Sequence, residues 1–463
     1  MKEKIVKFMF PLLLSLSLTQ SIPPTPPPAE VVQPQVVRPL PGNLDKVPVF
    51  NSNSPELVLK EGILLSTFPP DGKKVPTAHL NFPFQGRFDI FAHHIAKAEP
   101  PENLRSLYVG IILHNPGSSP VTINVLQAAS YLSQPDAPFI GLPSFSNNIL
   151  GTVFSGPGDR ITNDVLRGKR QEIFPAQIVI QPQEYHILLN LPIPVQGLTP
   201  PLNGRSTLMR LRSNGKVYAA SLAMFAQTNP DGSERAPTLE EWQNLLNNSD
   251  VAGPRDKTPT PLEETGKPRI YGRVAGVASG SQWRALLVDE PKAKYLTIPQ
   301  PGQAFSYALS TVHGGSLGTN QIQSAKMLVR YPDTAYRAHG NYGIQYSLKL
   351  PLYNNSQSPQ TVSVAIQTPI KEDQLVKPGL RFFNTPAKQV FFRGTVRVRY
   401  KDDQGKPQTQ FVHLMQTRGQ VGEPLTILNM PAGDRRLVEV DLIYPPDASP
   451  PQVLTVATQA KSY

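Results

Sequence analysis

Cysteine is absent from this 463-residue sequence. Without thiols the chain forms no disulfide, no thiolate metal site and no cysteine nucleophile. Long apolar runs are also absent after Leu18, where no stretch approaches the roughly 18 consecutive apolar residues of a membrane-spanning helix. These absences exclude thiol chemistry and an acylated lipoprotein anchor, and they predict a mature chain without a transmembrane span.

Short motifs of known chemistry are scarce as well. We find no nucleophile elbow, P-loop, dinucleotide-binding glycine pattern or metalloprotease zinc motif. The acidic turns at residues 231–234 and 402–405 are shorter than the roughly twelve residues of a calcium-binding loop, and they are typical of hairpin turns. The sequence therefore favours a protein without catalytic activity, and we expect no cofactor, no bound metal and no nucleic-acid partner.

The first residues have the pattern of an export signal. Lys2, Lys4 and Lys7 precede an apolar stretch over residues 8–18. At a helical rise of about 1.5 Å per residue, this stretch spans about half of a bilayer core, which suits a signal peptide. We expect residues 1–21 to be a signal peptide that directs the protein to the periplasm, the outer-membrane surface or the exterior. An uncleaved interfacial anchor is the alternative.

Proline and positive charge are abundant. The 51 prolines oppose long helices and favour turns and edge strands. Removing residues 1–21, which hold three lysines and one glutamate, lowers the formal net charge from +11 to +9. A basic exported chain suits an anionic surface polysaccharide or an envelope protein as its partner. The dispersed positive charges also fit an ordinary solvated surface.

Residues 22–48 contain the proline-rich stretches PPTPPPAE and VVQPQVVRPLPG. Such a composition favours extended polyproline II and cannot bury a core. We expect this segment to be a disordered spacer between the signal peptide and the folded chain.

From residue 49 onward, short segments of alternating apolar residues lie between turn residues, which is the pattern of strands. Two regions repeat at a spacing of 239 residues: a strand, an asparagine-led turn, a proline and a second strand. Asn115 and Asn354 are equivalent in this repeat, as are Pro120 and Pro359. Asparagine suits left-handed turn geometry, and proline fixes φ where no ladder donor is needed. The repeat predicts two related sandwiches.

One helix interrupts the strands. Thr238 and Glu241 have the spacing of a capping box, and Trp242 shares a helical face with the neighbouring leucines. We predict a mainly β protein of two immunoglobulin-like or jelly-roll-type β-sandwich domains with one short linker helix. The expected boundaries are domain 1 at 49–237, helix and linker at 238–268, and domain 2 at 269–463.

Residues 313–342 hold the main candidate site. His313, Asp333, His339 and Tyr342 gather there with several glycines, and they are the residue types expected to bind a ligand. The turn that begins at His313 with two glycines resembles an oxyanion-hole turn, but a loop that needs positive φ is the favoured interpretation.

Two other groups of residues are weaker candidates. Arg393, Arg397 and Arg399 fall on one face of a predicted strand and could contact an anionic polymer, with a solvated outer face as the alternative. A metal site would need His79 and Asp89 to converge with the adjacent pair at 93 and 94, which points to opposite faces of a strand. We favour ordinary histidines there.

Four stretches have a distinctive composition: GRFDIFAHHIAK at 86–97, GRSTLMRLRSNGKVYAASLAMFA at 204–226, RIYGRVAGVASGSQW at 269–283 and STVHGGSLGTNQIQSAKMLVRYPDTAYRAHGNYGIQYSL at 310–348. Together they resemble an exported cyanobacterial family catalogued as domain of unknown function 3370. The resemblance covers nearly all of the chain after the proline-rich segment. It implies an envelope or extracellular location and transfers no catalytic residue.

Two functional hypotheses follow. We favour an exported protein that binds surface polysaccharide or another envelope protein without catalysis. The alternative is a hydrolase that acts on envelope polymers, with its site around residues 313–342.

Overall fold

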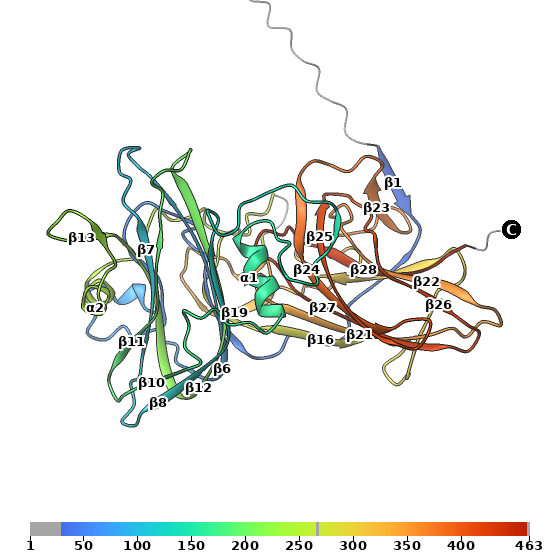
Figure 1. Ribbon diagram of the computed structural model, residues 1–463, viewed down its shortest axis with the longest axis horizontal. Coiled ribbons are helices and arrows are strands. Elements are labelled where there is room, and N and C mark those ends of the chain that lie inside the picture. Colours follow the sequence, from blue (N-terminus) through green and yellow to red (C-terminus); the bar gives the residue numbers. More distant parts are fainter. Residues whose placement is uncertain (1–28, 265–267, 461–463) are drawn as a thin grey trace, which may run out of the picture.

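The computed structural model describes residues 29–264 and 268–460. The chain is mainly β, as predicted, and Figure 1 shows two β bodies side by side along the long axis, with helix α1 (Pro157–Leu166) between them. The predicted signal peptide, residues 1–21, lies outside the described residues. Within the described ranges, neither helix has the length and hydropathy needed to cross a membrane.

The first body is built on one strand of 24 residues, β12 (Leu202–Phe225). Its first half pairs with β6 (Phe84–Lys97) and β8 (Val121–Leu132), and its second half pairs with β7 (Leu107–His114) and β5 (Gly62–Ser66). The register against β6 shifts in the middle of β12. A single strand therefore belongs to both layers of this sandwich.

The remaining strands of the first body extend its layers. They are β3 (Pro48–Ser52), β4 (Leu57–Val58), β10 (Gln177–Ile180), β11 (Tyr185–Ile193), β15 (Ala275–Ser279), β19 (Ala325–Arg330) and β20 (Arg337–Ala338). The interior between the layers is aromatic: Phe50, Phe84 and Phe88 are fully buried, and the ring centroids of Phe84 and Phe88 lie 4.8 Å apart.

The second body consists of a seven-stranded and a five-stranded sheet. The larger sheet contains β16 (Gln282–Leu286), β21 (Gln345–Tyr353), β27 (Arg435–Ile443), β24 (Val390–Lys401), β25 (Pro407–Thr417) and β9 (Phe145–Asn147), with β17 (Leu296–Thr297) beside β21. The smaller sheet contains β2 (Val36–Arg38), β18 (Ala304–Leu309), β28 (Gln452–Thr458), β22 (Gln360–Gln367) and β26 (Pro424–Met430).

Short elements complete the described chain. They are β1 (Glu30–Gln33) paired with β23 (Leu380–Phe383), β13 (Gln227–Thr228) paired with β14 (Glu234–Arg235), a 3-10 turn at Pro76–Ala78, and helix α2 (Leu239–Asn248). The predicted capping box of α2 is confirmed, because Thr238 Oγ1 accepts from the backbone N–H of Glu241 and the Glu241 carboxylate accepts from that of Thr238.

The predicted domain boundaries need a correction. β15 lies beyond residue 269, in the range predicted for domain 2. It nevertheless pairs with β3 on one side and with β19 on the other, so both strands belong to the sheet of the first body. In the other direction, β9 joins the edge of the large sheet in the second body by pairing with β25. An alternating strand pattern specifies which face is buried but not which open edge the strand joins. The segment 238–268 therefore does not separate the sheets.

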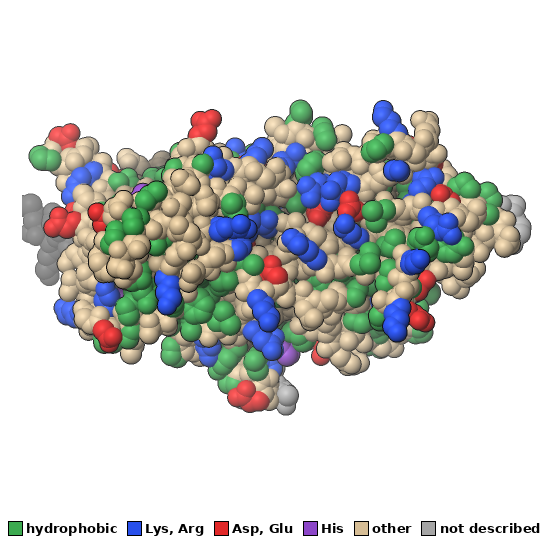
Figure 2. Space-filling model, turned by 90° about the horizontal axis from the view of Figure 1, so that it is seen from below, with side chains coloured by type: hydrophobic (Ala, Val, Ile, Leu, Met, Phe, Trp, Pro, Cys, Tyr) green, Lys and Arg blue, Asp and Glu red, His purple; other side chains and the backbone are tan. Residues whose placement is uncertain are grey.

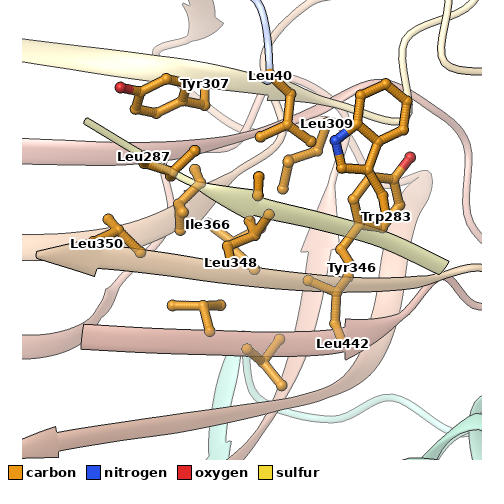
Figure 3. Packing of buried hydrophobic residues seen from close by; sticks show 14 of the residues in the cluster. Leu40, Trp283, Leu287, Tyr307, Leu309, Tyr346, Leu348, Leu350, Ile366 and Leu442 are labelled. Carbon is orange, nitrogen blue, oxygen red and sulfur yellow. The ribbon is translucent and has the colours of Figure 1, made fainter. Parts of the chain in front are cut away.

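Residues 29–48 also differ from the predicted disordered spacer. In this segment β1 pairs with β23 and β2 pairs with β18. Leu40 is 1% exposed and packs in the second core beside Trp283, whose indole N–H donates to the Pro41 carbonyl oxygen at 2.9 Å (Figure 3). The extended backbone that proline and valine favour has the shape of an edge strand, so this composition also permits sheet pairing.

Replacing Leu40 with alanine tests this docking. A buried leucine truncated to alanine typically costs about 2–5 kcal/mol in the free energy of unfolding, because apolar contact is lost and a cavity is left. We expect a loss of this size in urea unfolding, and a small effect for Val36→Ala, since Val36 is 61% exposed. Equal and small effects of the two variants would show that the segment contributes nothing to the fold.

The predicted repeat at Asn115 and Asn354 is confirmed in its hydrogen bonds. The Asn115 side-chain amide donates to three carbonyl oxygens, those of Ser119, Ile180 and Gln181, at 2.8, 3.0 and 3.1 Å. The Asn354 amide donates to those of Ser358, Met430 and Pro431 at 2.9, 2.9 and 3.0 Å. Each amide thus ties its own turn to a second hairpin, β10–β11 in one body and β26–β27 in the other. Both side chains are fully buried.

Asn354→Ala is expected to destabilise the protein by about 2–4 kcal/mol, because three carbonyl oxygens, one buried and two part-buried, lose their donor at roughly 1 kcal/mol each. The adjacent Asn355 is exposed, and Asn355→Ala serves as the matched control. Denaturant unfolding of the two variants checks this expectation. A loss below about 0.5 kcal/mol for Asn354→Ala would refute the structural role that we assign to the amide.

Helix α1 is not predicted from the sequence. It begins with Pro157 and ends before Gly168, which has a φ of +77°. Asp159 in its first turn accepts from the Ser155 backbone N–H at 2.8 Å and lies 2.7 Å from His413 Nε2 on β25. Both side chains are fully buried. This pair fixes the helix against the second body.

Candidate functional site

A cleft of about 610 Å³ opens where the two bodies meet. The first body contributes Asn51 of β3 and the residues that follow this strand, Asn53 and Glu56. The other lining residues come from the segment after α2, from β20 and the loop that follows it, and from the second body: Asp256, Lys257, Ile270, Tyr271, Gly272, Arg273, Val274, Val312, Ala338, His339, Gly340, Asn341, Tyr342, Lys371, Phe391, Ala448, Ser449 and Pro450. The site is therefore assembled from distant parts of the sequence.

Two asparagine side chains in this cleft have unused hydrogen-bonding capacity. Asn51 and Asn53 are 4% and 3% exposed, and the side-chain carbonyl oxygen of each is enclosed without a hydrogen-bond partner among the described residues. Buried polar atoms are nearly always paired in native proteins, by protein, water or ligand. The two residues line the cleft, and their side-chain oxygens are acceptors that the described protein leaves unpaired.

One end of the cleft has matched charges. Arg273 forms an ion pair and hydrogen bond with Glu56, and Glu56 also lies 3.7 Å from the His93 ring. Burial raises the pKa of Glu56, and the Arg273 guanidinium opposes this shift. Asp256 accepts from the Ser54 hydroxyl at 2.7 Å. These carboxylates have protein partners, so this end is a hydrogen-bonding surface with little net charge.

The other end contains Tyr271, His339 and Lys371. The Lys371 ammonium donates to the Tyr271 hydroxyl at 2.8 Å and lies 4.7 Å from the centre of its ring. The Tyr271 ring lies 4.8 Å from the His339 ring. Burial, together with the positive side chains nearby, lowers the pKa of His339 to about 3. His339 is therefore neutral at neutral pH.

The residues predicted in 313–342 divide into three positions. His339 and Tyr342 line the cleft. His313 lies behind them, with its ring 6.4 Å from that of His339 and its carbonyl oxygen accepting from the Tyr271 hydroxyl. Asp333 is engaged elsewhere by Arg255, at 2.7 and 3.1 Å.

The predicted basic stripe on β24 forms intramolecular pairs. Arg397 and Arg399 reach Asp441 at 3.0 and 3.2 Å, and Arg399 also lies 3.4 Å from Glu439. Arg393 stacks on the Phe139 ring at 5.1 Å. Because the neighbouring strand supplies carboxylates to this stripe, we do not include these arginines in the candidate site.

Residues 314–318 have the G-x-S-x-G spacing of a hydrolase elbow, which corrects the expectation that the chain lacks this pattern. The structural setting differs from an elbow, which places an exposed serine between a strand and a helix. Ser316 is 1% exposed, and its hydroxyl donates to the Asp373 carboxylate at 2.7 Å. Gly314 has a φ of +74°, which confirms the interpretation of the turn as a loop that needs positive φ.

The histidines considered for a metal have other partners. His79 bonds to Ser66, His93 to Ser206 and His94 to Ser52, at 2.8, 2.8 and 2.9 Å. Asp89 is paired with Arg87. Over the described ranges, no group of three or more potential ligand side chains is placed to hold a metal ion.

The other cleft residues could hardly be recognised from the sequence. Asn51 and Asn53 lie at the end of an ordinary strand, and Lys371 lies in a loop after β22. Tyr271 and Arg273 belong to the stretch 269–283 that supports the family resemblance, which was the one available signal. These side chains form a site only because strand pairing brings them together.

Comparisons with solved structures find remote likenesses. Lac15 from a marine microbial metagenome is 9% identical over 82% of this chain and 54% of its own, so this chain spans about half of that protein, with a TM-score of 0.11. The 11S allergen of Cocos nucifera L. is 11% identical over 83% of this chain and 88% of its own, also with a TM-score of 0.11. The R92A mutant of Bacillus subtilis oxalate decarboxylase OxdC is 9% identical over 86% and 78%, with a TM-score of 0.10. We draw neither fold nor function from likenesses at these scores.

The search of curated proteins gives no match. The family comparison is decisive, since the profile described as "Protein of unknown function (DUF3370)" matches residues 35–458. The match includes both β bodies and the whole lining of the cleft. The chain therefore belongs to the DUF3370 family of proteins of unknown function.

Proposed function

We propose that this protein is exported to the cell envelope and binds a surface polysaccharide in the cleft between its two β bodies, without catalysis. The observation that carries the proposal is the pair of enclosed, unpartnered side-chain oxygens of Asn51 and Asn53 in this cleft. An enclosed acceptor without a protein partner gains most from a ligand that supplies a donor.

The rest of the lining suits a sugar. The rings of Tyr271, Tyr342 and Phe391 offer apolar faces for the C–H surface of a pyranose. Glu56 and Arg273 offer polar atoms to its hydroxyl groups on the wall next to the two asparagines. A concave, mixed surface of this kind fits one or two sugar units better than the flat face of another protein.

The predicted signal peptide and the positive net charge support an envelope location. Residues 1–21 have the composition of a signal peptide, and the net charge without them is +9. Figure 2 shows lysine and arginine side chains spread along the length of one face, with acidic side chains among them. A basic surface raises the local concentration of anionic polymers.

A hydrolase with a site around residues 313–342 is the second candidate. The G-x-S-x-G spacing at 314–318 favours it, but the Ser316 hydroxyl is buried and donates to Asp373. Asp333 is paired with Arg255, so it does not meet His313 or His339 as an acid-base partner. Binding without catalysis is therefore our first choice.

Export is tested by fractionating the native host and sequencing the mature N-terminus by mass spectrometry. We expect the protein in an envelope or medium fraction with an N-terminus near Ile22, because signal peptidase would remove residues 1–21. An intact Met1 in the cytoplasmic fraction would contradict the proposed location.

Binding is tested with Asn53→Ala and purified envelope polysaccharide in affinity electrophoresis at low salt. Because the side-chain oxygen of Asn53 has no protein partner, we expect a change in unfolding free energy below about 1 kcal/mol together with roughly ten-fold weaker retention. Asn355→Ala, at an exposed turn outside the cleft, should retain the polymer like the wild type. Absence of retention for the wild type, or equal retention for both variants, would count against the cleft.

A further inference from the structure

The end of the cleft around Lys371 carries positive charge that the protein itself does not neutralise. Lys371 lines the cleft, Arg337 begins β20 two residues before His339, and Arg269 precedes Tyr271 by two residues. Arg337 and Arg269 are near enough to His339 to help to lower its pKa, after the larger effect of burial. Three cationic side chains therefore surround one neutral imidazole.

These cations have backbone partners in place of carboxylates. Arg337 donates to the Ser324 carbonyl oxygen at 3.3 Å. Arg269 donates to three carbonyl oxygens, those of Pro261, Leu262 and Glu264, at 3.1, 3.2 and 2.9 Å. Within residues 29–264 and 268–460, none of the three cations forms an ion pair. The contrast with Arg273, which is paired with Glu56 in the same cleft, makes this end of the lining distinct.

The position of Lys371 is fixed by its neighbours. Its ammonium donates one N–H to the Tyr271 hydroxyl, and that hydroxyl donates in turn to the His313 carbonyl oxygen. An ammonium has three N–H donors, so two remain for another acceptor. The stem of Lys371 is packed closely on Gly315, where an added Cβ would lie 2.7 Å from Lys371 Cε. The cation is thus held beside the cleft.

His339 provides a second unused group at the same end. It is 7% exposed, and its Nδ1 is enclosed without a hydrogen-bond partner among the described residues. Arg337 Nε is enclosed and unpartnered as well. A neutral imidazole can offer Nδ1 as an N–H donor by choice of tautomer. The His339 and Arg337 nitrogens lack acceptors, and the neighbouring cations lack anionic partners. An oxyanion would supply both an acceptor and a negative charge.

We propose that Lys371 and His339, with the Tyr271 hydroxyl holding the ammonium in place, form a subsite for a single oxyanion of the bound glycan, a carboxylate or a sulfate ester. This inference rests on the proposed function and adds the chemical class of the polymer. The polymer carries a negatively charged group on the sugar that binds at this end of the cleft. Lysine acts as a point charge without the bidentate geometry of arginine, so the site accepts either anion. The neutral, hydrogen-bonding end near Asn53 holds the rest of the sugar.

The experiment compares three oligosaccharide ligands by calorimetry at a fixed ionic strength of about 0.15 M, where long-range effects of net charge are screened. The ligands are an oligogalacturonate, its methyl ester and a sulfated oligosaccharide of equal length. The variants are Lys371→Met, which keeps the volume of the side chain without its charge, and Lys377→Met, at an exposed lysine outside the cleft lining. Sodium sulfate, followed through the NMR signal of the His339 ring, probes the subsite without any sugar.

We expect the wild type to bind an acidic oligosaccharide about ten-fold more tightly than the ester, as one charge-assisted hydrogen bond implies. Lys371→Met should remove this preference by weakening the binding of the acid about ten-fold more than that of the ester, while Lys377→Met should keep it. The carboxylate and sulfate arms show which anion is preferred. Should Lys371→Met fail to fold, Tyr271→Phe removes the hydroxyl that holds the ammonium and should weaken the same preference.

The outcomes separate the subsite from the proposed function. Equal Kd values for acid and ester, or equal losses for both in Lys371→Met, would overturn the subsite and leave polysaccharide binding intact. A sulfate response that needs Lys371, without binding of any oligosaccharide, would support the subsite and overturn the glycan as its ligand. Absence of both responses would overturn both proposals.

Discussion

The cleft depends on the antiparallel pairing of β3 with β15. In this ladder Asn51 lies opposite Gly276, and just beyond it the Asn53 backbone N–H donates to the Val274 carbonyl oxygen at 2.8 Å. The pairing therefore places the asparagines beside the segment that carries Tyr271 and Arg273. Gly276 has no room for a side chain, because a Cβ there would clash with the Val329 carbonyl oxygen on β19. One ladder thus joins two parts of the chain and creates the site between them.

Buried polar groups position the parts around this ladder. Asn115 and Asn354 each satisfy three carbonyl oxygens and join two hairpins within a body. The Asp159–His413 pair fixes α1 to the second body. These groups are expensive to bury alone, and the hydrogen bonds between them make each contact specific for one arrangement. The cleft adds enclosed oxygens and cations that lack protein partners, and a ligand that binds there would complete their bonding.

The cleft has two surfaces that differ in charge. Where Arg273 meets Glu56, the wall offers hydrogen bonds and little net charge. Where Lys371 rests on Tyr271, positive charge has no counterpart in the described protein. A polymer of neutral backbone and anionic substituents would match both surfaces. The basic stripe on β24 is different, since Asp441 and Glu439 already neutralise much of its charge.

The sequence by itself determined the local features of this protein. Alternation and proline predicted the β class, Thr238 and Glu241 predicted the start of α2, and Asn115 and Asn354 predicted the repeated turns, because each of these features depends on neighbours in the chain. Helix α1 had local signals too, in Pro157, Asp159 and Gly168, but a ten-residue helix among strands gives a short pattern.

Only the tertiary structure decided which strand edges pair. Edge pairing uses backbone N–H and C=O groups that all residues except proline share, so the side chains of β3 and β15 do not specify which strand each will pair with. The docking of residues 29–48 could not be predicted for the same reason. The candidate site follows from that choice. His339 and Tyr342 could be selected by residue type, whereas Asn51, Asn53 and Lys371 acquire a role only through the folded chain that surrounds them.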